Sequence, residues 1–485
     1  MLRQWFAERE GTFWVSRIRG RRRGRGKVRF GSPDVSLTGC SGLAAVSELV
    51  DRLSVVTALD RAVGPIKERA RGLSAGGLLV GMATAQLLGE DCLAGLDRRR
   101  EDEAGGLLAP VGFAPSTTAG SLARRFGPAQ LAGVETGLAE LTGRWLERLP
   151  AQQRAELVTR RPTIDLDTTD VEVYGRFKEG VAYNYLGQRC GRPHLASWAE
   201  ASLPLAADLL GGRDDPQPRA AELLRRALAA LPAGVCARPR VRADAGYFTA
   251  ELAWAAGEAG ADFAIAAKRN SAFWRAFAGV GAEAWIPARG MHGAEVTAID
   301  YAPAGWPPGT HTIVRRVRVA AADISADPRS RRRRTIPKDQ LALVLGGECD
   351  HAWAVSFIVT NLPVHSAADV TAVEAWFRGR VSIEERIREA KLGAGLRHLP
   401  SGNPTVNAVW TWAALLAGAI SVMLQSLTGI DTEHGRARSA RLRHQLLRVP
   451  ARVIRHARGL TLRLPPGRQL LPEVLARLRA LPASP

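Results

Sequence analysis

Cysteine is scarce in this sequence. Its 485 residues include only five cysteines, and no two of them have the C-x-x-C spacing of a metal-binding or redox pair. They are scattered and odd in number, at positions 40, 92, 190, 236 and 349. This pattern argues against a zinc site and against a disulfide framework, and it is typical of a reducing compartment. We therefore expect a cytoplasmic protein.

Acidic residues are also few compared with basic ones. Asp and Glu number 47 against 67 Lys and Arg, which gives a net charge of +20 and a pI near 10.9. Most of the excess is arginine, the better bidentate phosphate ligand. This balance predicts a polyanionic partner, with nucleic acid as the first expectation and an acidic membrane surface as the competing one. The length and the 46% hydrophobic content allow several folded domains.

Long uncharged apolar segments are limited to two, and the N-terminus lacks the apolar run of a secretory signal. No charged residue occurs from Leu399 to Ile430, and residues 408–427 are long enough to cross a bilayer. Polar residues such as Asn407 and Gln425 dilute this segment, so we predict a buried helix, with a membrane span as the alternative. The same prediction applies to residues 72–89.

One stretch, W-F-R-G-R-V-S-I-E-E-R-I-R-E-A-K from Trp376 to Lys391, has the composition of a helix with no Gly or Pro after Gly379. Helical steps of three and four residues place one set of side chains on a common face: Phe377, Arg380, Glu384, Ile387 and Lys391. One acid then lies between two bases. Taken alone, the stretch is also compatible with a solvated helix that carries i,i+4 ion pairs.

Two further acids end predicted strands. One strand covers Thr163–Asp167, and the other covers Arg240–Ala243 and is followed by Asp244 and a turn at Gly246. Two strand-end carboxylates and one helix carboxylate suit a pocket for two divalent metal ions, which typically lie about 3.5–4 Å apart. Carboxylates are the natural ligands of Mg²⁺. Asp165 remains an alternative to Asp167, because strand alternation points both side chains to the same face.

These blocks resemble the bacterial insertion-sequence transposases that carry an Asp-Asp-Glu (DDE) triad. The helix is similar to their Tyr-x2-Arg-x3-Glu-x6-Lys signature, with Phe377 in the Tyr position. The segments D-L-D-T-T-D-V-E-V-Y-G, Y-N-Y-L-G-Q-R and R-P-H resemble the first-Asp region, and R-A-D-A-G-Y-F resembles the second. The likeness covers about Ser36 to Leu427 and is to the group called insertion-sequence family 1380.

The resemblance implies an α/β fold with a ribonuclease-H-like catalytic core and a β-rich insertion. It also implies an activity: cutting the ends of an insertion sequence and joining them to target DNA. The implied catalytic and metal-binding residues are Asp167, Asp244 and Glu384, which would hold two Mg²⁺ or Mn²⁺ ions. The implied DNA contacts in the helix are Arg380, Lys391 and Phe377, the last by stacking.

The expected partner is double-stranded DNA, both the terminal inverted repeats and the target. We expect a homodimer to bind it, associated with the nucleoid and not with a membrane. A non-catalytic DNA-binding protein derived from a transposase is the alternative function.

We expect a basic flexible arm over 1–35, an α-helical DNA-binding domain over 36–155, a catalytic core over 156–270 and 351–430, a β-rich insertion over 271–350 and a basic helical tail over 431–485.

Additional DNA contacts are expected outside the core. Arg124 and Arg125 follow a helix start at Pro115–Thr118 and could contact phosphates, although a plain helical bundle fits the same pattern. In the insertion, Trp306 could stack on an extruded base, with packing as the alternative. The run Arg331–Arg334 is expected in an exposed loop. In the tail, Leu442, Leu446 and Leu447 with interspersed arginines suggest an amphipathic helix for DNA or a second subunit.

Overall fold

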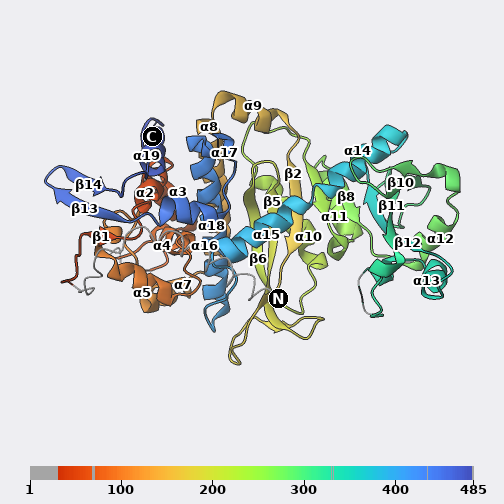
Figure 1. The fold of residues 1–485 in the computed structure, drawn as a ribbon, viewed down its shortest axis with the longest axis horizontal. Coiled ribbons are helices and arrows are strands. Elements are labelled where there is room, and N and C mark those ends of the chain that lie inside the picture. The colour runs from red at the N-terminus through yellow and green to blue at the C-terminus, as the bar shows by residue number, and fades with distance from the viewer. Residues whose placement is uncertain (1–30, 68–71, 329, 331, 434, 483–485) are drawn as a thin grey trace, which may run out of the picture. The chain divides into compact units, whose positions relative to one another are not determined.

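The computed structural model describes residues 31–67, 72–328, 330, 332–433 and 435–482, and the chain from Ser36 onward forms one compact unit (Figure 1). Most of the predicted basic arm therefore lies outside the described residues. The region expected to be helical is helical. Its helices are α2 (Leu43–Arg52), α3 (Val55–Val63), α4 (Ala75–Leu87), α5 (Ala94–Glu101), α6 (Glu103–Gly106), α7 (Ser116–Ala123), α8 (Pro128–Arg148) and α9 (Ala151–Thr159).

A large mixed sheet forms the centre of the unit, with the strand order β3-β5-β2-β7-β8-β12-β11-β10-β9, and β4 and β6 also pair with β5. Its first strands are β2 (Thr163–Thr168), β3 (Val171–Glu172), β4 (Ala182–Tyr183), β5 (Arg189–Trp198) and β6 (Leu203–Gly211). β2 pairs antiparallel with β5, and β5 pairs antiparallel with β6. The sequence predicted β2 to within one residue, at Thr163–Asp167, but it did not predict β6.

Strand–helix alternation follows this hairpin, as predicted. Helix α10 (Gln217–Ala229) leads to β7 (Arg240–Ala243), and α11 (Ala250–Glu258) leads to β8 (Asp262–Ala266). β7 runs parallel to both β2 and β8, with Leu166 opposite Ala243. Parallel neighbours bring the carboxyl ends of β2 and β7 to one edge of the sheet, which is where the two predicted aspartates stand.

The predicted insertion contains β strands, but they do not form a separate sheet. Its elements are α12 (Ser271–Ala278), β9 (Ile286–Pro287), β10 (Ala294–Ile299), β11 (His311–Ala320) and α13 (Lys338–Leu345). β11 pairs antiparallel with β12 (His351–Thr360), and β12 pairs antiparallel with β8 of the core. The β-rich insertion is therefore continuous with the core sheet, because β12 connects its strands to β8.

The predicted continuous helix from Trp376 to Lys391 is broken into α14 (Ala367–Arg378) and α15 (Val381–Gly393). The break has a tertiary cause. Arg242, on β7, donates a hydrogen bond of 2.6 Å to the backbone carbonyl of Trp376 at the end of α14. A Cβ at Gly379 would lie 2.6 Å from the Arg242 guanidinium, so only glycine permits this approach.

Helix α16 (Pro404–Thr428) passes a length and composition test for a membrane span, yet 83% of its apolar window is buried inside the protein. It packs against α4, α8 and β6. Its Asn403 side chain caps the N-terminus by accepting a hydrogen bond from the Val406 amide, and Gly429 ends it in the left-handed conformation. The prediction of a buried helix agrees with this packing.

The tail is not wholly helical, contrary to the prediction. It contains α17 (Ile430–Glu433), α18 (Ser439–Leu442), the π-helical turn η5 (Arg443–Leu447), β13 (Ala451–His456), β14 (Gly459–Arg463) and α19 (Leu470–Arg479). β13 and β14 form a three-stranded sheet with β1 (Leu37–Thr38). Leu442, Leu446 and Leu447 are at most 2% exposed. The apolar face expected to bind DNA or a second subunit is therefore buried in the protein's own core.

Candidate active site

Asp167 and Asp244 occupy neighbouring positions at the carboxyl ends of β2 and β7. The parallel register pairs Leu166 with Ala243, so the next residues along the two strands are the two aspartates. Adjacent strands lie about 4.8 Å apart, and residues in register point to the same face. Asp167 is 9% exposed, whereas Asp244 is half-buried. The Oδ1 atom of Asp244 accepts a hydrogen bond of 2.8 Å from the Gly246 amide, which fixes its carboxylate at the start of the next turn.

Arg380 connects Asp167 to Glu384. Its Nη1 atom donates to Asp167 Oδ2 at 3.1 Å, and its Nη2 atom donates to Glu384 Oε1 at 3.4 Å. Burial alone would lower the pKa of Arg380, but the carboxylates of Asp167, Asp244 and Glu384 outweigh this effect and raise it. One guanidinium group thus lies between the strand carboxylate and the helix carboxylate.

The environment of Asp167 raises the pKa of its carboxyl group. Burial raises the pKa of this carboxyl to about 6, the positive charge of Arg380 opposes the rise, and the negative charge of Asp244 adds to it. The Thr168 amide also donates to Asp167 Oδ1, at 2.8 Å. A cation bound between the two aspartates would favour the ionised form, so cation binding and proton release are coupled at this position.

Asp165, the alternative acid, has its carboxylate fully engaged in a buried ion pair. Arg242 donates from Nε to Oδ1 at 2.7 Å and from Nη2 to Oδ2 at 2.9 Å, and Ser382 donates to Oδ2 at 2.9 Å. Asp165 is 0% exposed. These partners leave Asp167 as the more accessible of the two β2 acids.

The third acid is less tightly held. Glu384 lies in the first turn of α15, which crosses the sheet at β2 (Figure 1), and 59% of its side chain is exposed. Within the described ranges, no three Asp, Glu, His or Cys side chains lie close enough together to hold a metal ion. The convergence of all three acids therefore stays a prediction. The donor set still fits a hard cation, because it offers carboxylate oxygens alone and already holds a cationic guanidinium between two of them.

Lys391 lies on α15 two turns beyond Glu384, and its contact is with the strand-end loop. Its Nζ atom donates a hydrogen bond of 2.7 Å to the backbone carbonyl of Asp170. Burial lowers the pKa of Lys391, and the negative charge of Asp170 opposes the decrease. Lys391 therefore ties α15 to the chain that leaves β2, three residues after Asp167.

Two predicted DNA-contact residues, both aromatic, are packed against other side chains. Phe377 is on α14, only 9% exposed, and packs in a core cluster with Val370 and Val373, so the stacking role suggested for it has little exposed ring surface to support it. Trp306 is half-buried against Phe248 and Phe263, with ring centroids 4.9 and 5.9 Å apart, which is the packing alternative.

The two arginines predicted to contact DNA in the helical region are exposed, unlike these aromatic residues. Arg124 and Arg125 directly follow α7 and are exposed, so they are accessible to phosphates.

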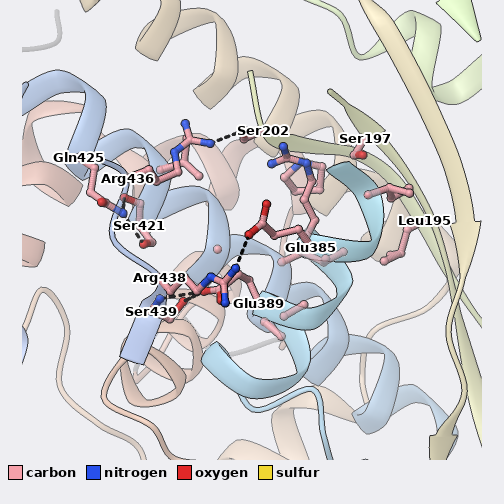
Figure 2. A pocket seen from close by; sticks show the side chains of 18 of the residues that line it. Leu195, Ser197, Ser202, Glu385, Glu389, Ser421, Gln425, Arg436, Arg438 and Ser439 are labelled. Atoms are coloured by element: carbon pink, nitrogen blue, oxygen red, sulfur yellow. Dashed lines mark hydrogen bonds and ion pairs between the residues drawn. The ribbon is translucent and has the colours of Figure 1, made fainter. Parts of the chain in front are cut away.

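Residues that the sequence analysis did not single out hold the opposite flank of α15 (Figure 2). Arg438 donates to Glu385 at 2.9 Å, and the Ser439 amide and hydroxyl donate to Glu389 at 2.8 and 2.7 Å. These contacts line a cavity of about 290 Å³ between α15, α16 and the β5–β6 hairpin. The tail thus supports the helix that carries Glu384. The sequence signal for this role is weak, because the partners lie about 50 residues apart.

Comparisons with known proteins bear on the whole chain. A solved structure, "Cryo-EM structure of piggyBac transposase synaptic complex with hairpin DNA (SNHP)", is similar over 84% of this chain and 79% of that chain, at 8% sequence identity and a TM-score of 0.39. No curated protein matches the sequence. A protein-family model described as "Transposase DDE domain group 1" matches residues 24–328 and 330–483. Since that match covers nearly the whole chain, the protein belongs to the group 1 family of DDE transposase domains.

Proposed function

We propose that this protein cuts the ends of its insertion sequence and joins them to target DNA, with Asp167, Asp244 and Glu384 as the catalytic acids. One observation carries the proposal: neighbouring strand ends place Asp167 beside Asp244, and Arg380 links Asp167 to Glu384. Membership of the DDE transposase family supports the same activity. Our assignment to insertion-sequence family 1380 rests on the quoted motifs.

The arrangement β6-β5-β2-β7-β8 supports a ribonuclease-H-like core. Three antiparallel strands are followed by two parallel ones that are reached through helices α10 and α11. In this core, Asp167 lies on the central strand β2, and Asp244 directly follows the neighbouring strand β7. Both acids are therefore held by backbone hydrogen bonds on rigid elements, while Glu384 comes from a helix that crosses the sheet.

Asp167, Asp244 and Glu384 would hold two divalent ions, Mg²⁺ or Mn²⁺. When bound, such ions supply an activated water and neutralise charge on the reacting phosphate. Arg380 then has a second role in this proposal. Arg380, which donates to Asp167 and Glu384, would place positive charge beside a phosphate oxygen bound near Asp167. Lys391 contributes a second positive charge on the same helix.

The proposed partner is double-stranded DNA, bound by a homodimer. The net charge of +20 supports a polyanionic partner. Arg124 and Arg125 of the helical region and Arg332 and Arg334 of the insertion are exposed, and each offers a guanidinium to the DNA backbone. The proposal places the protein in the cytoplasm, associated with the nucleoid.

The test compares Glu384→Gln with Glu385→Gln in a strand-cleavage assay on DNA that carries the neighbouring inverted repeats, with Mg²⁺ present. Glu384→Gln is expected to abolish cleavage while DNA binding persists, because an amide is a poor ligand for Mg²⁺. Glu385 is the matched control, since it is the adjacent and equally exposed glutamate and pairs with Arg438 instead. Binding without Mg²⁺-dependent cleavage by the wild-type protein would favour the non-catalytic alternative.

A further inference from the structure

The chain between β3 and β5 carries a concentration of exposed aromatic side chains. We call residues 172–189 the flap, drawn in yellow in Figure 1. The exposed fractions of its aromatic residues are high: 82% for Tyr174, 94% for Phe177, 60% for Tyr183 and 87% for Tyr185. Among the residues that the structure describes, the next most exposed aromatic side chain outside the flap is Trp254, at 44%. The flap therefore holds nearly all the strongly exposed aromatic surface of the described chain.

The backbone of the flap is fixed although its aromatic side chains are exposed. Arg189 donates to the Lys178 carbonyl at 2.7 Å, and the Glu179 amide donates to the Gly402 carbonyl at 2.9 Å. At the tip, the Asn184 side chain accepts from the amides of Leu186 and Gln188, at 3.0 and 2.9 Å. Aromatic side chains held in water on a fixed scaffold are typical of a binding surface, because little conformational entropy is lost when a partner covers them.

Asp170 joins the flap to the candidate active site. Its carboxylate accepts hydrogen bonds from Asn184 at 2.8 Å and from Arg192 at 2.7 Å, and its backbone carbonyl accepts from Lys391. Asp170 follows Asp167 by three residues. The tip of the flap is therefore bonded, through Asn184, to the segment that directly follows the first acid.

The chemistry of the flap suits nucleic-acid bases. Its charged residues are three basic and two acidic, which gives a net charge of +1. This charge does not repel a polyanion such as DNA. Every base has a π-face that stacks on an aromatic side chain. The hydroxyl of Tyr174 donates to Glu172 at 3.1 Å, which leaves the ring face exposed for stacking. Bases expose their π-faces only when they are unpaired, as at a frayed or cleaved strand end.

We propose that the flap stacks on unpaired bases of the DNA strand whose phosphodiester lies at the acids. This inference rests on the proposed function and names the part of the substrate that the flap recognises. Tyr174, Phe177 and Tyr185 are the most exposed of the aromatic residues and form the stacking surface.

The experiment measures the affinity of the full chain for two duplexes in Ca²⁺, one blunt and one with three unpaired nucleotides at its end. Wild type is expected to bind the unpaired end about tenfold more tightly, as base–aromatic stacking predicts. The triple variant Tyr174→Ala, Phe177→Ala, Tyr185→Ala should lose this preference and keep its affinity for the blunt duplex. The conservative variant Phe177→Tyr and the control Trp254→Ala should both retain it.

Three results would contradict the proposal, and they differ in what else they overturn. If wild type binds neither duplex, the proposed function fails together with the flap. If wild type cleaves DNA in Mg²⁺ but the triple variant keeps its preference for the unpaired end, only the flap proposal fails. If the triple variant loses self-association while its DNA binding is unchanged, the aromatic residues form an interface between two copies of the chain, and the flap proposal again fails alone.

Discussion

Arg242 and Asp165 form a two-bonded ion pair in the interior of the sheet, with N–O distances of 2.7 and 2.9 Å. The two residues are opposite each other in the parallel register of β2 and β7. Two residues further along each strand, the same register brings together Asp167 and Asp244. Along β2 and β7, the ion pair of Asp165 and Arg242 therefore comes first, and the two acids follow at the strand ends. This separates the structural carboxylate from the candidate catalytic one.

Substitution should separate these two aspartates by their effects. Asp165→Ala leaves the Arg242 guanidinium buried without its partner, so we expect a loss of about 3–5 kcal/mol in the free energy of unfolding. Asp167→Asn should leave stability unchanged or slightly raised, because the raised pKa of Asp167 reflects the cost of burying its charge, which Asn removes. The same substitution should abolish cleavage. Urea unfolding and the cleavage assay measure the two effects. A stable Asp165→Ala variant without cleavage would restore Asp165 as the catalytic acid.

The pH dependence of cleavage should report on Arg380. The pKa of Asp167 is about 6 and metal binding needs the ionised carboxylate, so cleavage at limiting Mg²⁺ should fall as the pH drops below about 6. Arg380 lowers this pKa. Removing its charge in Arg380→Ala should therefore move the decline to higher pH, while Arg380→Lys should move it less.

The control for this prediction is Arg388→Ala, which removes an exposed arginine from the same helix. A pH profile of Arg380→Ala that coincides with the wild-type profile, or that is displaced to lower pH, would show that Arg380 does not set the ionisation of Asp167.

Lys391 should matter more for the reaction than for folding. Lys391→Met keeps the apolar stem and removes the hydrogen bond to the Asp170 carbonyl, so we expect a loss of about 1–2 kcal/mol in stability. The cleavage rate should fall far more, because a positive charge near the reacting phosphate acts mainly in the transition state.

Arg443→Met provides the comparison for Lys391. It removes a charged donor to the Gly393 carbonyl, at the end of the same helix but on the side held by the tail. This variant should lose at least as much stability and cleave normally once folded. Near-normal cleavage by Lys391→Met would leave that lysine with a structural role only.

The insertion should contribute to the salt dependence of DNA binding. Arg332 and Arg334 are exposed, whereas Arg333 donates to the Ala326 carbonyl at 2.9 Å. The double variant Arg332→Ala, Arg334→Ala should reduce the slope of log K against log salt by about two, since each phosphate contact contributes about 0.9. Arg225→Ala, which removes an exposed arginine from α10, should leave the slope unchanged. An equal slope for the double variant and the wild type would exclude the contact.

Local sequence patterns were sufficient for the elements that hold the two aspartates. The alternation in Arg240–Ala243 predicted β7 at its observed bounds, and Thr163–Asp167 predicted β2 to within one residue. The periodicity of residues 376–391 predicted helix correctly but missed the break at Gly379. Gly379 is a local signal for this break, but the guanidinium that bonds the Trp376 carbonyl there comes from β7, more than 130 residues earlier in the chain.

Contacts between distant segments also explain the other differences between the sequence prediction and the structure. Asp165 and Asp167 are equivalent by strand alternation, and only the pairing of β2 with β7 shows which of them meets Arg242. The leucines of the tail have helical spacing, but this spacing does not show what they pack against. In the fold they belong to the same core cluster as the N-terminal helices. Contacts between distant segments decided each of these cases, and they are visible only in the fold.

The three-stranded sheet of β1, β13 and β14 has a consequence for the synthesis of the protein. Leu37 and Thr38 pair with Arg452 and Ala451, and α2 packs against α19. At a synthesis rate of about 5–20 residues per second, the first of these partners waits roughly 20–80 s for the second to be made. The N-terminal helices therefore complete their core only after the acids, the flap and the insertion have been translated. A ribosome that stops before β13 releases a chain in which β1 and α2 lack these packing partners.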